Sequence, residues 1–139
     1  PTAVQQAFKK AYPNAKILGT SEEKENKVTY YEIESMDGAQ RRDFLYTVNG
    51  KVYEMEELMA EKDLTAGIKE SIAKNFAGYK FSKGEKTTNK DGVSYDVVLK
   101  KENAGVAVVF NEGGKVIKKT VMKSKESKEE KEEKEEDEK

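Results

Sequence analysis

The chain has 139 residues, 26 of them basic and 27 acidic, and contains no His, Cys or Trp. These absences exclude a Ser-His-Asp triad, a cysteine nucleophile, a disulfide and a zinc site of the ordinary ligand type. No segment approaches the roughly 18 consecutive apolar residues that a membrane-spanning helix needs. The formal net charge of −1 gives no reason to expect nucleic-acid binding.

Residues 123–139 differ in composition from the rest of the chain, with six Lys, nine Asp or Glu and two Ser. Because this segment has no apolar residue, a helix there would have no face to bury. We expect a solvated, charged low-complexity tail whose deletion leaves thermal stability nearly unchanged. The remaining residues are numerous enough to bury one sizeable core.

The first element expected in the chain is a helix. Val4, Ala7, Phe8 and Ala11 follow the i, i+3, i+4, i+7 spacing of one helix face, and Pro13 ends the helix. Beyond Pro13 the apolar period changes to two, which is typical of strands. A first, less clearly patterned strand is expected at 16–23.

Two Gly-containing dipeptides predict hairpins with two-residue type I′ turns, Asp37-Gly38 and Asn49-Gly50. The first turn would place Ile33 opposite Arg42 and Tyr31 opposite Phe44. The second would place Tyr46 opposite Tyr53 and Phe44 opposite Met55. Both turns put the same six side chains on one buried face of the sheet: Tyr31, Ile33, Phe44, Tyr46, Tyr53 and Met55.

The second half of the sequence matches the first without a gap at a shift of 64 residues, since Val4 falls on Ile68 and Phe8 on Ile72. Thr65 is the expected helix N-cap, a strand is expected at 80–88, and Gly113-Gly114 replaces Asn-Gly at the corresponding turn. The matching buried face comprises Tyr95, Val97, Val106, Val108, Phe110 and Ile117.

The sequence therefore predicts an α+β fold, a tandem αββββ repeat with an antiparallel sheet of up to eight strands and helices packed on one face. Residues 1–57 form the first repeat, 58–64 an acidic helical connector and 65–122 the second. Since the connector has no Gly, Pro or Ser run, we expect the halves to share one sheet within one domain, followed by the tail at 123–139.

Several short motifs resemble PepSY-like domains, also called β-lactamase-inhibitor-like (BLIP-like) proteins. They are Pro1-Thr2-Ala3-Val4, Tyr12-Pro13-Asn14-Ala15, Tyr31-Glu32-Ile33, Asn49-Gly50-Lys51-Val52 and Leu64-Thr65-Ala66-Gly67-Ile68. The chain lacks the Trp often found on the family's first strand, and Phe76-Ala77 replaces the second Tyr-Pro pair. The resemblance implies a bacterial periplasmic or secreted protein with a helix-backed sheet that binds a protein or peptide. It brings no catalytic residues.

The same strand periodicity predicts which side chains face water on the open side of the sheet. We expect this face to bind a protein or peptide partner, with apolar side chains as anchors and charged ones orienting the partner. The candidate partner-binding residues are Tyr30, Arg41, Leu45, Asp96, Val98 and Val109. The alternative is an ordinary solvated sheet surface, because scattered exposed apolar residues are common.

The carboxylates Glu32 and Asp43, expected opposite each other, are candidates for an acid/base pair, but a screened, solvated surface explains them better. No metal or cofactor motif is present, and we expect a monomeric, non-enzymatic binding module, with inhibition of a hydrolase or peptidase as one form of that binding. One alternative is a structural envelope domain with no discrete site and the tail as spacer. Another is a carrier of a small ligand between sheet and helices.

Overall fold

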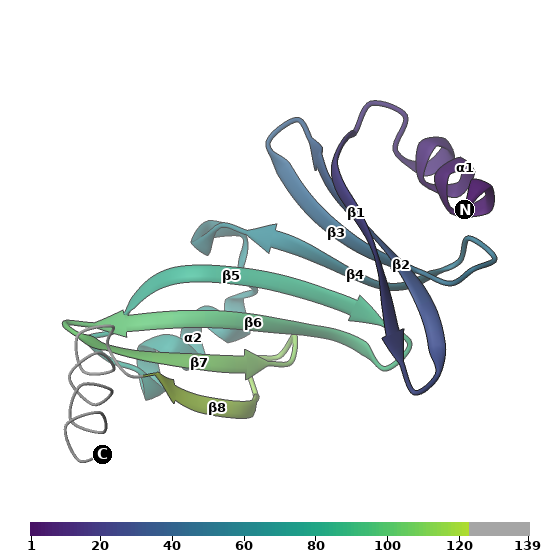
Figure 1. The fold of residues 1–139 in the computed structure, drawn as a ribbon. Helices are drawn as coiled ribbons and strands as arrows, with labels where there is room; N and C mark the ends of the chain where they lie inside the picture. The colour runs from purple at the N-terminus through teal and green to yellow at the C-terminus, as the bar shows by residue number, and fades with distance from the viewer. Residues whose placement is uncertain (123–139) are drawn as a thin grey trace, which may run out of the picture. The chain divides into compact units, whose positions relative to one another are not determined.

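The computed structural model describes residues 1–122, so the predicted tail at 123–139 lies outside the described residues. The elements follow in the order α1 (Thr2–Ala11), β1 (Lys16–Glu25), β2 (Val28–Asp37), β3 (Gln40–Tyr46), β4 (Val52–Met59), η1 (Glu61–Asp63), α2 (Ala66–Asn75), β5 (Lys80–Asn89), β6 (Gly92–Lys101), β7 (Ala104–Phe110) and β8 (Val116–Met122) (Figure 1). α1 begins at Thr2 and α2 at Ala66, a separation of 64 residues that the strands of the two halves keep.

The eight strands form one antiparallel sheet in chain order, from β1 at one edge to β8 at the other, which confirms the predicted α+β class. By its contacts the chain divides into two compact units. The first unit comprises Pro1–Met59 together with Glu85–Ser94. The second comprises Ala60–Gly84 together with the described residues from Tyr95 onward.

The core of the first unit lies between α1 and one face of β2 and β3. Val4 and Phe8 from α1 pack against Ile33, Phe44 and Tyr46, and all five side chains are almost fully buried. The helix ends at Ala11, before Pro13, where the chain cannot continue a helical hydrogen-bond pattern. The apolar face of α1 predicted from the residue spacing therefore covers the sheet, as expected.

The turn between β2 and β3 differs in register from the prediction. Asp37 lies opposite Gln40, so the two-residue loop is Gly38-Ala39, with Gly38 at φ 61°. Ile33 consequently faces Phe44, and the predicted pairing of Ile33 with Arg42 is wrong by two residues. A shift of two leaves every side chain on its predicted face, because side chains alternate with a period of two.

The β3–β4 hairpin closes through a longer loop than the predicted type I′ turn, which is therefore wrong. The Thr47 N–H donates to the Lys51 carbonyl at 2.8 Å, the Gly50 N–H donates to the Thr47 carbonyl at 2.9 Å, and Gly50 has a φ of 84°. This pattern is a three-residue loop that ends in a left-handed glycine. Tyr46 then lies opposite Val52 but Leu45 opposite Glu54, so Tyr53 is an unpaired bulge residue.

The β7–β8 hairpin repeats this arrangement. Its loop closes with Asn111 N–H donating to the Lys115 carbonyl at 3.0 Å, and Gly114 has a φ of 92°. Phe110 lies opposite Val116 and Val109 opposite Lys118, which leaves Ile117 as the bulge residue. The prediction that Ile117 is buried is therefore wrong: the bulge removes it from the strand alternation, and 60% of its surface is exposed.

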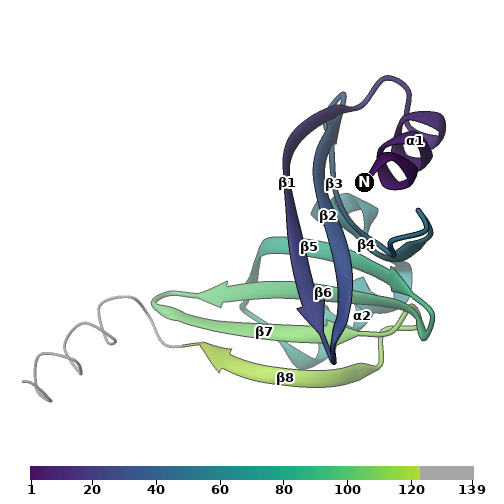
Figure 2. The ribbon, with the colours of Figure 1, turned by 45° about the vertical axis from the view of Figure 1, so that its right-hand side comes forward.

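The core of the second unit lies between α2 and one face of β6 and β7 (Figure 2). The predicted N-cap is confirmed, since Thr65 Oγ1 accepts from the Ile68 N–H at 3.2 Å. Phe76, at the end of α2, meets Phe110 edge-on with 6.3 Å between ring centroids. The buried side chains are Leu64, Ile68, Phe76, Tyr95, Val97, Leu99, Val106, Val108 and Phe110.

Glycines on both sides, Gly67 in α2 and Gly113-Gly114 in the β7–β8 loop, allow the start of α2 to approach this loop closely. A Cβ on Gly67 would overlap the Gly113 backbone, and one on Gly114 would overlap the Gly67 carbonyl. The Thr65 hydroxyl also donates to the Glu112 carbonyl at 2.7 Å. Helix and hairpin therefore touch backbone to backbone at this point, where any side chain would separate them.

Candidate functional site

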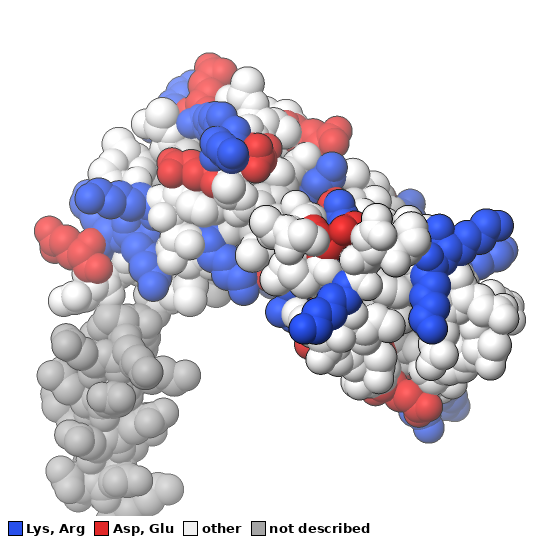
Figure 3. Space-filling view, turned by 90° about the horizontal axis from the view of Figure 1, so that it is seen from above, with Lys and Arg blue, Asp and Glu red and all other residues white. Residues whose placement is uncertain are grey.

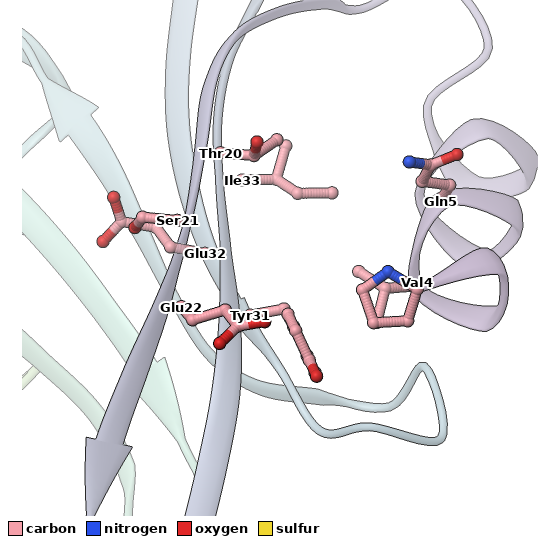
Figure 4. Close-up of a pocket in the computed structure, with 9 residues that line it drawn as sticks. Val4, Gln5, Thr20, Ser21, Glu22, Tyr31, Glu32 and Ile33 are labelled. Atoms are coloured by element: carbon pink, nitrogen blue, oxygen red, sulfur yellow. The ribbon is translucent and has the colours of Figure 1, made fainter.

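The two faces of the first unit's sheet can be followed in Figure 4. Thr20 and Ile33 point toward α1 and border a cavity of about 220 Å³ beside Val4 and Gln5, whereas Glu32 points away from the helix. We call the sheet face on which Glu32 lies, opposite to α1, the outer face of the first unit. The alternation predicted from the sequence places Tyr30, Arg41 and Leu45 on this face.

Leu45 and Arg41 occupy the positions predicted for them. Leu45 is partly exposed, whereas its neighbours Phe44 and Tyr46 are each 1% exposed. Arg41 is held by two carboxylates, with Nη2 3.4 Å from Glu34 Oε2 and Nε 3.0 Å from Asp43 Oδ1. The hydrogen bond and charge of Asp43 raise the pKa of Arg41 above its ordinary value.

Acidic side chains surround Leu45 on the outer face. The pKa of Glu32 is raised from 4.5 to about 7, first by burial and then by hydrogen bonds with Glu34 and Glu23 and by the negative charges of these two neighbours. A small cavity of about 130 Å³ is lined by Glu23, Glu25, Glu32, Asp43, Phe44, Leu45, Glu54 and Glu56. Arg41 neutralises only part of this charge, so the outer face of the first unit is acidic around an apolar centre.

The prediction of Tyr30 as an exposed anchor needs correction. Its side chain is only 9% exposed, and its ring stacks on that of Tyr53 with centroids 4.2 Å apart and an interplanar angle of 25°. Burial first, and then the hydrogen bond with Tyr53, raise the pKa of Tyr30 above its ordinary value. The physical reason is the β4 bulge, which takes Tyr53 off the predicted buried face and places its ring against Tyr30.

The other three candidate residues belong to the second unit. Asp96 lies opposite Val109, and Val98 lies opposite Ala107. Asp96 is exposed and both valines are partly exposed, while Val97 and Val108, their neighbours along the strands, are each 1% exposed. These three residues share the sheet face opposite to the buried one, which we call the outer face of the second unit.

The structure separates the two carboxylates that were predicted to lie opposite each other. Glu32 lies opposite Leu45, and Asp43 opposite Glu34, so the predicted opposition of Glu32 and Asp43 is wrong. Asp43 is instead the hydrogen-bond partner of Arg41. Within residues 1–122, no group of three or more acidic side chains has the geometry to hold a metal ion.

Acidic and basic side chains are interspersed on the molecular face shown in Figure 3. This distribution agrees with the near balance of 20 basic and 18 acidic residues in 1–122. No helix in the described part of the chain is long and apolar enough to cross a membrane.

Sequence reasoning missed an open groove at the start of β4, lined partly by residues of the β5–β6 hairpin. Its volume is about 580 Å³. The residues that border it come from segments far apart in the chain, among them Tyr12, Val52 and Lys90. No local motif marks such a site, because the pattern within each segment shows only a helix end, a strand start or a turn.

Comparison with known proteins identifies the fold. A BLIP-like protein from Bacteroides fragilis superposes with a TM-score of 0.68 at 18% identity, covering 89% of this chain and 87% of that one. A DUF2874 family protein from Bacteroides uniformis has a TM-score of 0.71 at 14% identity, with 87% and 88% covered. A candidate periplasmic protein from Bacteroides eggerthii has a TM-score of 0.72 at 16% identity, with 88% and 89% covered.

The chain thus has the fold of BLIP-like and DUF2874 proteins, which confirms the predicted resemblance to BLIP-like proteins. No protein-family model matches the sequence. No curated protein matches it either.

Proposed function

We propose that the chain is a non-enzymatic, extracytoplasmic module that binds a protein or peptide on the outer faces of its sheet. The observation that carries this proposal is the set of partly exposed apolar side chains, Leu45, Val98 and Val109, on the faces opposite to the buried cores. Charged groups flank them, Arg41 and the acidic side chains in the first unit and Asp96 in the second. An apolar centre with a polar rim is the usual composition of a protein interface.

A hydrolase is the partner class that the likeness to a BLIP-like protein favours, and the candidate periplasmic neighbour favours a location outside the cytoplasm. The corrected placement of Tyr30 changes the expected anchors. Leu45 and Val109 replace it as the residues whose truncation weakens binding, because Tyr30 is buried against Tyr53. Arg41 orients the partner, so its loss should mainly change the association rate and the salt dependence of that rate.

The test uses the full chain as bait in a periplasmic extract of a Bacteroides species, the genus of the structural neighbours. A captured protein is purified, and its affinity is measured for the parent chain and for Leu45→Ala and Val109→Ala. We expect each change to weaken binding by about tenfold, as truncated interface anchors commonly do. Val48→Ala is the matched control, since Val48 is 57% exposed in the β3–β4 loop, away from the outer face.

Inhibition is then measured directly on any captured hydrolase, with the parent chain and the same variants. Loss of inhibition in Leu45→Ala but not in Val48→Ala would support the proposal. If affinity is the same for all variants, the outer faces are not the interface. If no protein is retained by the parent chain, the alternative of a structural envelope domain gains support instead.

A further inference from the structure

The groove at the start of β4 has the size and lining of a small-molecule site. Its volume of about 580 Å³ lies within the roughly 300–1,000 Å³ of typical ligand pockets. It is lined entirely by residues of the first unit, namely Tyr12, Phe44, Thr47, Lys51, Val52, Tyr53, Met55, Thr88, Asn89 and Lys90. Half of these residues are aromatic or apolar.

The aromatic part of the groove is held in place by packing. The rings of Tyr12 and Phe44 lie 5.0 Å apart at an interplanar angle of 49°. The Tyr12 hydroxyl donates to Met55 Sδ at 3.8 Å, which ties the end of α1 to β4. At the mouth, Val52 is 53% exposed, so apolar surface is open to solvent there. A flat apolar group entering the groove would therefore remove apolar area from water.

The charged part of the lining is only basic. Lys51 and Lys90 border the groove, and no carboxylate does. Neither ammonium group has an ion-pair partner among the residues that the structure describes. These two lysines therefore give the groove a positive charge that is not balanced within its walls.

Turn hydrogen bonds fix the backbone of both lysines. The Lys51 N–H donates to Thr47 Oγ1 at 3.3 Å, and the Lys51 carbonyl accepts from the Thr47 N–H at 2.8 Å. In the β5–β6 hairpin, Asn89 Oδ1 accepts from the Asp91 N–H at 2.9 Å. The Asn89 amide also donates to Glu54 Oε1 at 3.3 Å, which fastens the hairpin to β4.

We propose that this groove binds a small aromatic carboxylate, with the ring system against Tyr12 and Val52 and the carboxylate between Lys51 and Lys90. The binding goes beyond the proposed protein-binding function and uses a different surface. The aromatic walls select a planar apolar body, since aromatic rings stack favourably on one another. The two unpaired ammonium groups select an anion and disfavour a cation.

The test compares two soluble probes that share an indole ring, the anion indole-3-acetate and the cation tryptamine. Because the chain contains no Trp, indole fluorescence reports the probe alone. Fluorescence anisotropy and amide chemical shifts are followed as each probe is titrated into the full chain. We expect saturable binding of indole-3-acetate that is about tenfold or more tighter than that of tryptamine, with shifts concentrated at the residues lining the groove.

The variant set isolates the two lysines. Lys51→Ala combined with Lys90→Ala should weaken indole-3-acetate binding by about tenfold, and Val52→Asp should abolish it. Lys115→Ala is the matched control, because Lys115 occupies the same place in the β7–β8 loop of the second unit. Thermal melting of every variant verifies that it folds, so a loss of binding reports the groove.

Three results would overturn the proposal. Equal affinity for both indole probes would show that charge does not select the ligand. Unchanged affinity in the double lysine variant, or an equal loss in Lys115→Ala, would place binding elsewhere. A peptide ending in phenylalanine that binds about tenfold more tightly than indole-3-acetate would identify the occupant as a protein C-terminus. None of these results depends on the outer faces, so they leave the proposed protein binding untouched.

Discussion

Replacing glycine by alanine adds a methyl group, which can destabilise the fold in two ways, and the glycines of the turns and of α2 allow the two effects to be measured separately. One is the cost of a left-handed backbone, about 1–2 kcal/mol for a residue with a Cβ. The other is steric overlap, about 1–3 kcal/mol in a packed site. Gly38 has a φ of 61° and open space around it, Gly67 has overlap without a positive φ, and Gly114 has both, with a φ of 92°.

We therefore expect Gly38→Ala to lower the free energy of unfolding by about 1 kcal/mol. Gly67→Ala should lower it by about 2 kcal/mol, although alanine favours a helix by about 1 kcal/mol over glycine. Gly114→Ala should cost about 4 kcal/mol, since it incurs both penalties. Gly50→Ala, with a φ of 84° and a Cβ 2.7 Å from the Ala3 carbonyl oxygen, should fall between the first and the last.

Urea-induced unfolding followed by far-UV circular dichroism measures this series, with thermal melting as a second readout. The order of the four costs is the critical result. If Gly67→Ala raises stability by the amount that helix propensity alone provides, the backbone of α2 does not approach the β7–β8 loop as closely as the structure shows. If Gly38→Ala is as costly as Gly114→Ala, steric overlap contributes nothing measurable.

Three further predictions concern side chains. Phe44→Ala should cost about 3–5 kcal/mol and Leu45→Ala less than about 1.5 kcal/mol in chemical denaturation, because only Phe44 leaves a buried cavity; similar costs would mean that Leu45 is also core. Tyr53→Ala should cost about 2 kcal/mol through the loss of its stacked ring, whereas Ile117→Ala at the corresponding bulge should change stability by less than about 0.5 kcal/mol; equal melting temperatures for the two variants would contradict this. The pKa of Glu32 is raised from 4.5 to about 7 in the fold, so the stabilisation that protonated Glu32 provides is present below about pH 4.5 and is lost as the pH rises to about 7. Glu32→Gln should therefore flatten the dependence of the unfolding free energy on pH over this window, a change on the order of 1 kcal/mol after screening by solvent. An unaltered pH profile would show that Glu32 titrates normally.

Strand faces were predictable from the sequence because alternation depends only on whether a residue number is odd or even within a strand. Phe44, Tyr46, Val108 and Phe110 are each at most 1% exposed, as their positions predicted. Strand register was not predictable to the same degree. Moving the β2–β3 loop from Asp37-Gly38 to Gly38-Ala39 changes every pair but no face, so no hydrophobic pattern distinguishes the two.

The candidate site was predicted less completely than the fold for a related reason. A bulge adds one residue without any composition signal, so the change of face at Tyr53, and with it the burial of Tyr30, was not visible in the sequence. Arg41 and Leu45 lie where the alternation placed them because no bulge intervenes between them. The groove next to β4 depends on contacts between distant segments, which a pattern within one segment does not encode.

The two bulge residues, Tyr53 and Ile117, occupy equivalent positions in the two halves but contribute differently to stability. Tyr53 is held against its stacked partner Tyr30, whereas Ile117, 64 positions later, leaves 60% of its surface in water. The stability of the fold therefore depends more on the side chain at the first position than on the one at the second. Substitutions at Ile117 should leave the protein folded, whereas a substitution at Tyr53 removes the stacked ring. The second bulge is thus a place where this architecture can acquire new surface chemistry at little cost to its stability.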